Sequence, residues 1–67
     1  MIDARYKRLT GPHAGQTYVV IGPNSEIEHP LRWMLHNAAR VGSKDMDDQA
    51  IVSEDELHDV KRWLPLP

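Results

Sequence analysis

The amino-acid sequence predicts a mainly β fold, formed by residues 1–67 as one small domain. Residues 17–21 are the densest cluster of β-branched and aromatic residues in the chain, a composition typical of strands. A glycine-containing segment, residues 11–15, separates this cluster from a second strand-like run at residues 5–10. Residues 49–52 form a further short apolar run, which predicts another buried strand.

The first two runs predict an antiparallel β-hairpin over residues 5–22. Gly11 and Gly15 can both adopt positive φ angles, and Pro12 restricts its own φ to a value suited to a turn. The Gly-Pro-Asn-Ser sequence at residues 22–25 then ends the second strand.

Residues 30–41 are consistent with two structures. As a strand, the segment alternates apolar and polar residues around Trp33. As a helix, it places Met34 and Ala38 on an apolar face and ends at Gly42, but it leaves Trp33 off that face. We expect the strand; the alternative is an α+β fold in which the hairpin packs against a helix at 30–41.

The C-terminal third predicts a helical turn. Ser53 and Glu56 have the spacing of a capping box, and Leu57 and Val60 follow on one helical face. Together with the strands, this turn predicts the following core: Tyr18, Val20, Trp33, Leu35, Ile51, Leu57, Val60 and Trp63.

Composition excludes several classes of protein. The chain has no cysteine, which excludes disulfides, cysteine-ligated zinc and a thiol nucleophile. A secreted domain of this size usually needs such cross-links, so we expect a cytoplasmic protein. No apolar run approaches the roughly 20 residues that span a bilayer, and the N-terminus lacks the apolar region of a signal peptide. We therefore expect no membrane partner.

Sequence motifs for catalysis or cofactor binding are also missing. No nucleophile elbow, dinucleotide fingerprint or phosphate loop occurs, and the four histidines lack the spacing of metal ligands. We expect a non-enzyme without a cofactor or a metal. One alternative is a degenerate calcium-binding loop at 45–56, in which Ala50 replaces the glycine that the loop needs. Its oxygen ligands would come from Asp45, Asp47, Gln49, Ile51, Ser53 and Glu56.

Charge is unevenly distributed along the chain. Residues 1–44 carry six basic and three acidic side chains, whereas residues 45–67 carry seven acidic and two basic ones. Near the N-terminus, Arg5, Lys7 and Arg8 surround Tyr6, a pattern that suits an RNA- or DNA-binding strand. Strand alternation, however, places Arg5 and Lys7 on one face and Arg8 on the other face with Tyr6.

The segment from Leu9 to Val20 resembles the turn of a KOW-type SH3-like barrel, in which an apolar residue precedes two glycines spaced Gly-x-x-x-Gly and an apolar strand follows. The rest of the chain is similar to small bacterial and phage SH3-like proteins of unknown function. This resemblance implies a barrel of four or five short strands with a C-terminal helical turn. It also implies binding of protein or RNA through loops at one rim, without catalysis.

The sequence therefore favours a protein-protein interaction accessory protein of bacterial or phage origin, with a protein partner. Its expected surface combines the 11–15 turn with the acidic 45–56 loop. The alternatives are an RNA- or DNA-binding module that uses Arg5, Lys7 and Arg8, and the calcium loop. The candidate binding residues are Arg5, Lys7, Arg8, His13, Arg40, Asp47 and Asp48.

Overall fold

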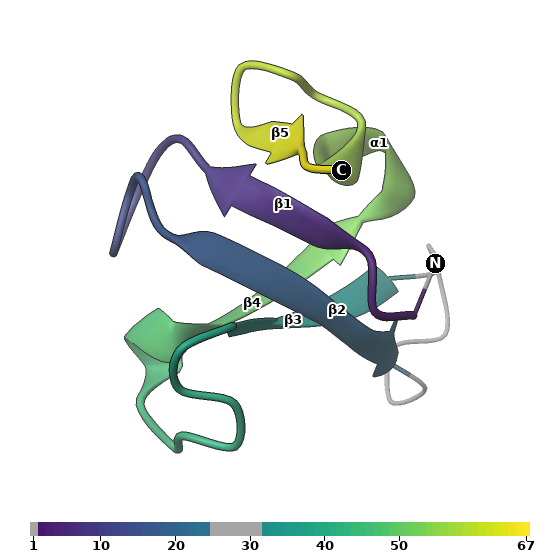
Figure 1. The fold of residues 1–67 in the computed structure, drawn as a ribbon. Coiled ribbons are helices and arrows are strands. Elements are labelled where there is room, and N and C mark those ends of the chain that lie inside the picture. Colours follow the sequence, from purple (N-terminus) through teal and green to yellow (C-terminus); the bar gives the residue numbers. More distant parts are fainter. Residues whose placement is uncertain (1, 25–31) are drawn as a thin grey trace.

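A computed structural model describes residues 2–24 and 32–67 of the chain. Over these residues, five antiparallel strands form one sheet that curls into a half-barrel (Figure 1). The strands are β1 (Arg5–Arg8), β2 (Thr17–Pro23), β3 (Arg32–Asn37), β4 (Gln49–Ser53) and β5 (Trp63–Pro65). A 3-10 turn, η1 (Met46–Asp48), precedes β4, and a short helix, α1 (Glu54–Leu57), follows it. The mainly β prediction, with a helical turn near the C-terminus, is confirmed.

The strand order is β4-β3-β2-β1-β5, so the last strand returns to pair with the first. Tyr6 lies opposite Tyr18 between β1 and β2, while Arg8 lies opposite Trp63 between β1 and β5. A β-bulge between Val20 and Gly22 shifts the register of β2 against β3. Because bulges increase local bending and twist, this irregularity favours the curl of the sheet.

The predicted hairpin is confirmed, and its turn uses three residues with positive φ. These angles are 87° at Gly11, 57° at His13 and 94° at Gly15. The Gly15 amide donates to the carbonyl oxygen of Arg8 at 2.6 Å, and this bond closes the turn. Glycine tolerates such angles freely, while His13 adopts a left-handed conformation that is uncommon for residues with a side chain.

The alternative of a helix at 30–41 is wrong for the described part of that segment, residues 32–41; residues 30 and 31 lie outside the described residues. Arg32–Asn37 is strand β3, which pairs with β2 on one side and β4 on the other. Asn37 ends the strand because its side-chain oxygen accepts a hydrogen bond from the Ala39 amide at 3.0 Å. Two flanking strands and this local turn outweigh the helical propensity of the alanines that follow.

The concave side of the half-barrel holds the hydrophobic core. Its buried members are Tyr6, Tyr18, Val20, Leu35, Val52, Leu57 and Trp63, with Ala4, Trp33 and Ala50 packed against them. Five of the eight predicted core residues are therefore buried: Tyr18, Val20, Leu35, Leu57 and Trp63. Trp33 contacts the core while remaining partly exposed.

Two core predictions are wrong, Ile51 and Val60, which are 41% and 64% exposed. Side chains alternate along a strand, so the burial of Val52 places its neighbour Ile51 on the outer face of β4. Helix α1 ends at Leu57, so the helical spacing that would bring Val60 to the core is not maintained. The Ser53 half of the capping box is formed: its hydroxyl oxygen accepts from the Glu56 amide, so Ser53 caps α1, and the hydroxyl donates to the Glu56 carboxylate.

This difference in burial predicts unequal effects of two alanine substitutions. We expect Leu57→Ala to lower the free energy of unfolding by about 2–5 kcal/mol, because it opens a cavity in the core. Val60→Ala should change it by less than about 1 kcal/mol. Urea unfolding followed by circular dichroism measures both values, and equal losses would contradict this assignment of the core.

None of the helices in residues 2–24 and 32–67 has the length and apolar character needed to cross a membrane.

Candidate functional site

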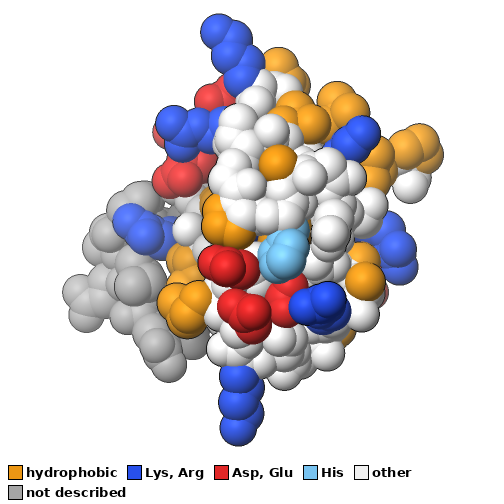
Figure 2. Space-filling view, turned by 90° about the vertical axis from the view of Figure 1, so that its left-hand side faces the viewer, with side chains coloured by type: hydrophobic (Ala, Val, Ile, Leu, Met, Phe, Trp, Pro, Cys, Tyr) orange, Lys and Arg blue, Asp and Glu red, His pale blue; other side chains and the backbone are white. Residues whose placement is uncertain are grey.

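Two loops that are distant in the sequence meet at one end of the half-barrel. His13, in the turn between β1 and β2, places its Nε2 atom 3.4 Å from Oδ1 of Asp48. Arg40, after β3, places Nη1 3.9 Å from Oδ2 of the same carboxylate. Figure 2 looks onto this end of the sheet and shows a histidine between acidic and basic side chains. Three of the predicted binding residues, His13, Arg40 and Asp48, are thus brought together.

Asp48 is the buried centre of this cluster, with a side chain only 1% exposed. Asn37 is also only 1% exposed. Its Nδ2 atom lies 3.4 Å from Asp48 Oδ1 and donates to Oε1 of Gln16 at 2.7 Å. Among the described residues, Asp48 Oδ2 has no hydrogen-bond partner. A buried carboxylate is costly unless charged or polar groups surround it. These contacts therefore hold the two loops against each other.

Asp47 contributes its backbone to the same arrangement. Its carbonyl oxygen accepts a hydrogen bond from the Tyr18 hydroxyl at 2.6 Å, which attaches the loop to the buried face of β2. Its amide donates to Oδ1 of Asp45 at 2.9 Å, which caps η1. As a result, the Asp47 side chain is exposed, while its amide and carbonyl groups are both hydrogen-bonded.

Arg8 points into the half-barrel, as strand alternation with Tyr6 predicts. Its guanidinium carbon lies 5.2 Å from the centre of the Tyr18 ring and 5.4 Å from that of Trp63, within the range of cation–π attraction. Nη1 donates to the Tyr18 hydroxyl at 3.2 Å, and Nε donates to the Thr10 carbonyl at 3.1 Å. The ion pairs of the described residues do not include Arg8, so its charge is held by aromatic rings and neutral oxygens.

Beside Arg8 lies a cleft of about 220 Å³, which we call the seam cleft because it occupies the gap between the two edges of the half-barrel. Its wall on the β4 side comes from residues 50–52, and its opposite wall includes Trp63 at the start of β5. Glu56 of α1 and Arg62 line it as well, joined by an ion pair of 3.9 Å. Arg8 is one of the binding residues predicted from the sequence, whereas the cleft beside it was not predicted. The sequence feature that points toward this cleft is the position of Arg8 on the same face of β1 as Tyr6, which is buried.

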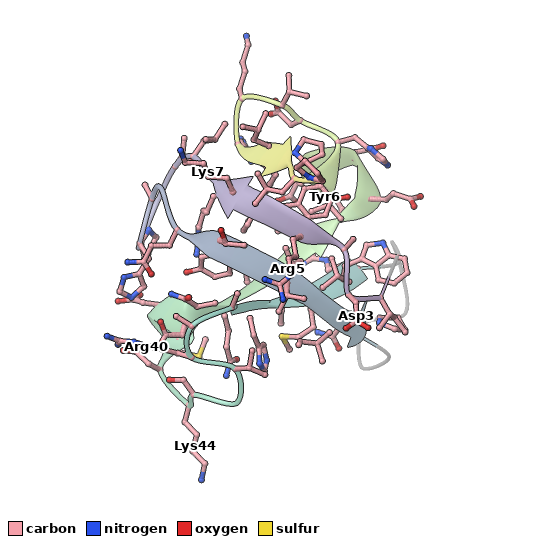
Figure 3. The ribbon with its side chains drawn as sticks, in the orientation of Figure 1. Asp3, Arg5, Tyr6, Lys7, Arg40 and Lys44 are labelled. Carbon is pink, nitrogen blue, oxygen red and sulfur yellow. The ribbon has the colours of Figure 1, made fainter. Side chains whose placement is uncertain are left out.

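The side chains of the other cations among the predicted binding residues, Arg5, Lys7 and Arg40, do not lie beside that of Arg8. Arg5 and Lys7 are exposed on β1, on the face opposite Tyr6, and Arg40 lies beyond β3 (Figure 3). Arg40 instead pairs with Asp48. Among the described residues, the predicted cations Arg5, Lys7, Arg8 and Arg40 therefore do not form one continuous basic surface of the kind that phosphate contacts use.

The calcium-loop pattern at 45–56 does not fold into a loop. Its central residues form strand β4, which pairs with β3 along its length. Asp45 caps η1, while Ser53 and Glu56 form the capping box of α1. Within the described ranges, no group of three or more histidine, aspartate or glutamate side chains is placed to hold a metal ion.

Comparisons with models of known protein families, with curated proteins and with solved structures find no match to this chain.

Proposed function

We propose that the chain is a non-catalytic protein-interaction module whose partner contacts the loop end of the half-barrel. We define the turn surface as residues 11–16, Arg40 and residues 45–48. The observation that carries this proposal is the burial of Asp48 between His13, Arg40 and Asn37. It joins two separate loops into one surface before any partner is present.

A preformed surface favours binding because fewer side chains and loops lose freedom when the partner docks. The exposed side chains of the turn surface are chemically mixed. Asp45 and Asp47 are acidic, and Met46 is 78% exposed between them. Methionine adapts to irregular apolar surfaces, and the two carboxylates favour a basic partner. We infer a partner that offers lysine or arginine around an apolar contact.

The resemblance of residues 9–20 to the turn of a KOW-type SH3-like barrel also supports the proposal. Proteins with this resemblance are of bacterial or phage origin, and the absence of cysteine in a chain of this size supports a cytoplasmic location. Rim loops are the binding elements in that family, and the turn surface is formed by such loops. The proposed function therefore follows from the position of the surface as well as from its chemistry.

The test reverses one exposed charge on the turn surface. The tagged full chain is first used to isolate a binding protein. We expect Asp47→Lys to weaken the affinity for this protein by about tenfold, because the new lysine repels a basic surface on the partner. The matched control is Asp55→Lys, which makes the same charge change at an exposed position of α1. Both variants should keep the wild-type circular dichroism spectrum. Capture is measured quantitatively with the tagged full chain, and equal binding by both variants would overturn the proposal.

A further inference from the structure

We propose that the seam cleft binds an extended acidic segment of the partner, which pairs with the outer edge of β4 and places a carboxylate on Arg8. The proposal rests on the proposed function in one respect, that the partner is a protein. It adds a second contact, beside the turn surface, and states the chemistry of the segment that occupies it.

Arg8 has unused capacity for an acidic ligand. It is half-buried, and its guanidinium lies within cation–π range of the Tyr18 and Trp63 rings, yet the ion pairs of the described residues do not include it. Nε and Nη1 are bound to neutral oxygens, and the group lines the seam cleft. Arginine offers five N–H donors in a planar fork that matches a carboxylate, so donor capacity remains for a ligand. The aromatic rings hold this fork in place before the ligand arrives.

Strand β4 lies at one edge of the sheet. In the sheet order β4 pairs only with β3, so its other edge has no strand partner among the described residues. Alternate residues of an antiparallel strand direct their N–H and C=O groups to opposite edges. Some of the N–H and C=O groups of residues 50–52 therefore lie on the outer edge of β4, and these residues line the cleft. A peptide added to an exposed sheet edge in this way gains main-chain hydrogen bonds, and its alternate side chains supply specificity.

The charges around the cleft favour a ligand with a single carboxylate. Among the described residues Arg8 has no acidic partner, whereas Arg62 already pairs with Glu56 and Asp59. The Glu56 carboxylate also lines the cleft, and the chain as a whole carries a net charge of −2. These charges disfavour a polyanion such as nucleic acid, but they accept one carboxylate at Arg8. An acidic peptide satisfies both this single cation and the β4 edge.

The position of the cleft links it to the turn surface. The Tyr18 hydroxyl accepts from Arg8, which lines the cleft, and donates to the Asp47 carbonyl of the turn surface. In the chain, Thr10 of the cleft directly precedes residue 11 of the turn surface, and Ala50 of the cleft lies two residues after Asp48. One partner can therefore contact both surfaces.

The experiment titrates the full chain with a blocked hexapeptide of alternating valine and threonine in which one central threonine is replaced by glutamate (the glutamate peptide), and follows tryptophan fluorescence because Trp63 lines the cleft. Alternation places the glutamate of an extended peptide on the side opposite the valines. We expect saturable binding, and about tenfold weaker binding of the peptide with glutamine in place of the glutamate, because a hydrogen bond between charged groups is replaced by a neutral one. The peptide with lysine at this position should not bind. A competition experiment with inorganic phosphate distinguishes a general anion site from a site specific for a peptide.

Arg8→Gln should weaken the glutamate peptide about tenfold, while Arg5→Gln, on the outer face of the same strand, should leave its affinity unchanged. If Arg8→Gln fails to fold, Arg8→Lys keeps the charge without the planar fork and should give a smaller loss. In the wild-type chain, amide hydrogen exchange within residues 50–52 should slow when the peptide is bound. Equal affinity for the glutamate and glutamine peptides, unchanged exchange in β4, or phosphate binding that displaces the peptide at equal concentration would each overturn the proposal.

The two proposals fail separately. Asp47→Lys should reduce capture of the whole partner and leave peptide affinity intact, since Asp47 does not line the cleft. If the peptide binds but Asp47→Lys does not weaken capture of the partner, the proposal for the turn surface is refuted and that for the cleft stands. If Asp47→Lys weakens capture but the peptide does not bind, the proposal for the cleft is refuted and that for the turn surface stands.

Discussion

Trp63→Ala is expected to lower the free energy of unfolding by about 3–5 kcal/mol, and to leave much of the chain unfolded at room temperature. A domain of this length has a total stability of only about 3–10 kcal/mol, so the loss is comparable to the whole. Trp63 is 4% exposed, and its ring meets that of Tyr18 edge to face at 5.6 Å between centres. It also forms one of the two aromatic faces that hold Arg8.

The effect should be large because β5 has just three residues, Trp63–Pro65. Of these three only Trp63 is buried, so its side chain provides the apolar attachment of the strand to the core. Leu64→Ala is the matched control, because Leu64 is the next residue of the same strand and is 43% exposed. Urea unfolding followed by circular dichroism should show a change below about 1 kcal/mol for this control. Similar losses for both variants would contradict the role assigned to Trp63.

Asp48→Lys is expected to be the second severe substitution, with a loss of at least about 3 kcal/mol of folding free energy. It removes the carboxylate that faces His13 and Arg40, and it places a new cation between them. The longer side chain must also occupy a site that is 1% exposed. An unpaired buried charge is among the few causes of very large destabilisation.

The neighbouring substitution Asp47→Lys provides the control, since it makes the same change of charge one residue away at an exposed position. We expect a change within about 0.5 kcal/mol for this variant, and chemical denaturation of the two proteins compares them directly. Asp48→Asn should fall between them, because it keeps the size and part of the hydrogen bonding but not the charge. A loss for Asp47→Lys as large as that for Asp48→Lys would show that charge alone, and not burial, sets the effect.

These expectations also change how the charge-reversal test of function is designed. Asp47 and Asp48 are equivalent in the sequence as two adjacent acids of a polar loop. In the structure, Asp47 is available to a partner, whereas Asp48 holds the loops together from inside. Only Asp47 can report on binding without also reporting on folding.

Local signals in the sequence were sufficient for much of the architecture. The hairpin follows from β-branched residues on both sides of a turn with Gly11 and Gly15, and the start of α1 follows from the Ser53 cap. Alternation along β1 correctly placed Arg8 on the face of Tyr6. Such features depend on neighbouring residues, and the same chemistry operates whatever the rest of the chain does.

Other features depended on distant partners. Residues 32–37 are a strand because β2 and β4 flank them, and the segment alone also fits a helical pattern. Val60 was expected in the core from its spacing, but α1 ends three residues earlier. The seam cleft requires β4, α1 and β5 to be placed together, and nothing within any single segment specifies that placement.

The sequence by itself therefore determined a β-hairpin domain without cysteine, its turn, its helical cap and the inward face of β1. The tertiary structure decided which charged side chains matter: Arg8 beside the Tyr18 and Trp63 rings near an open strand edge, and Asp48 buried between two loops. The physical reason is that strand and turn preferences act over a few residues. The burial and pairing of a charge depend on groups that only the folded chain brings within a few ångströms.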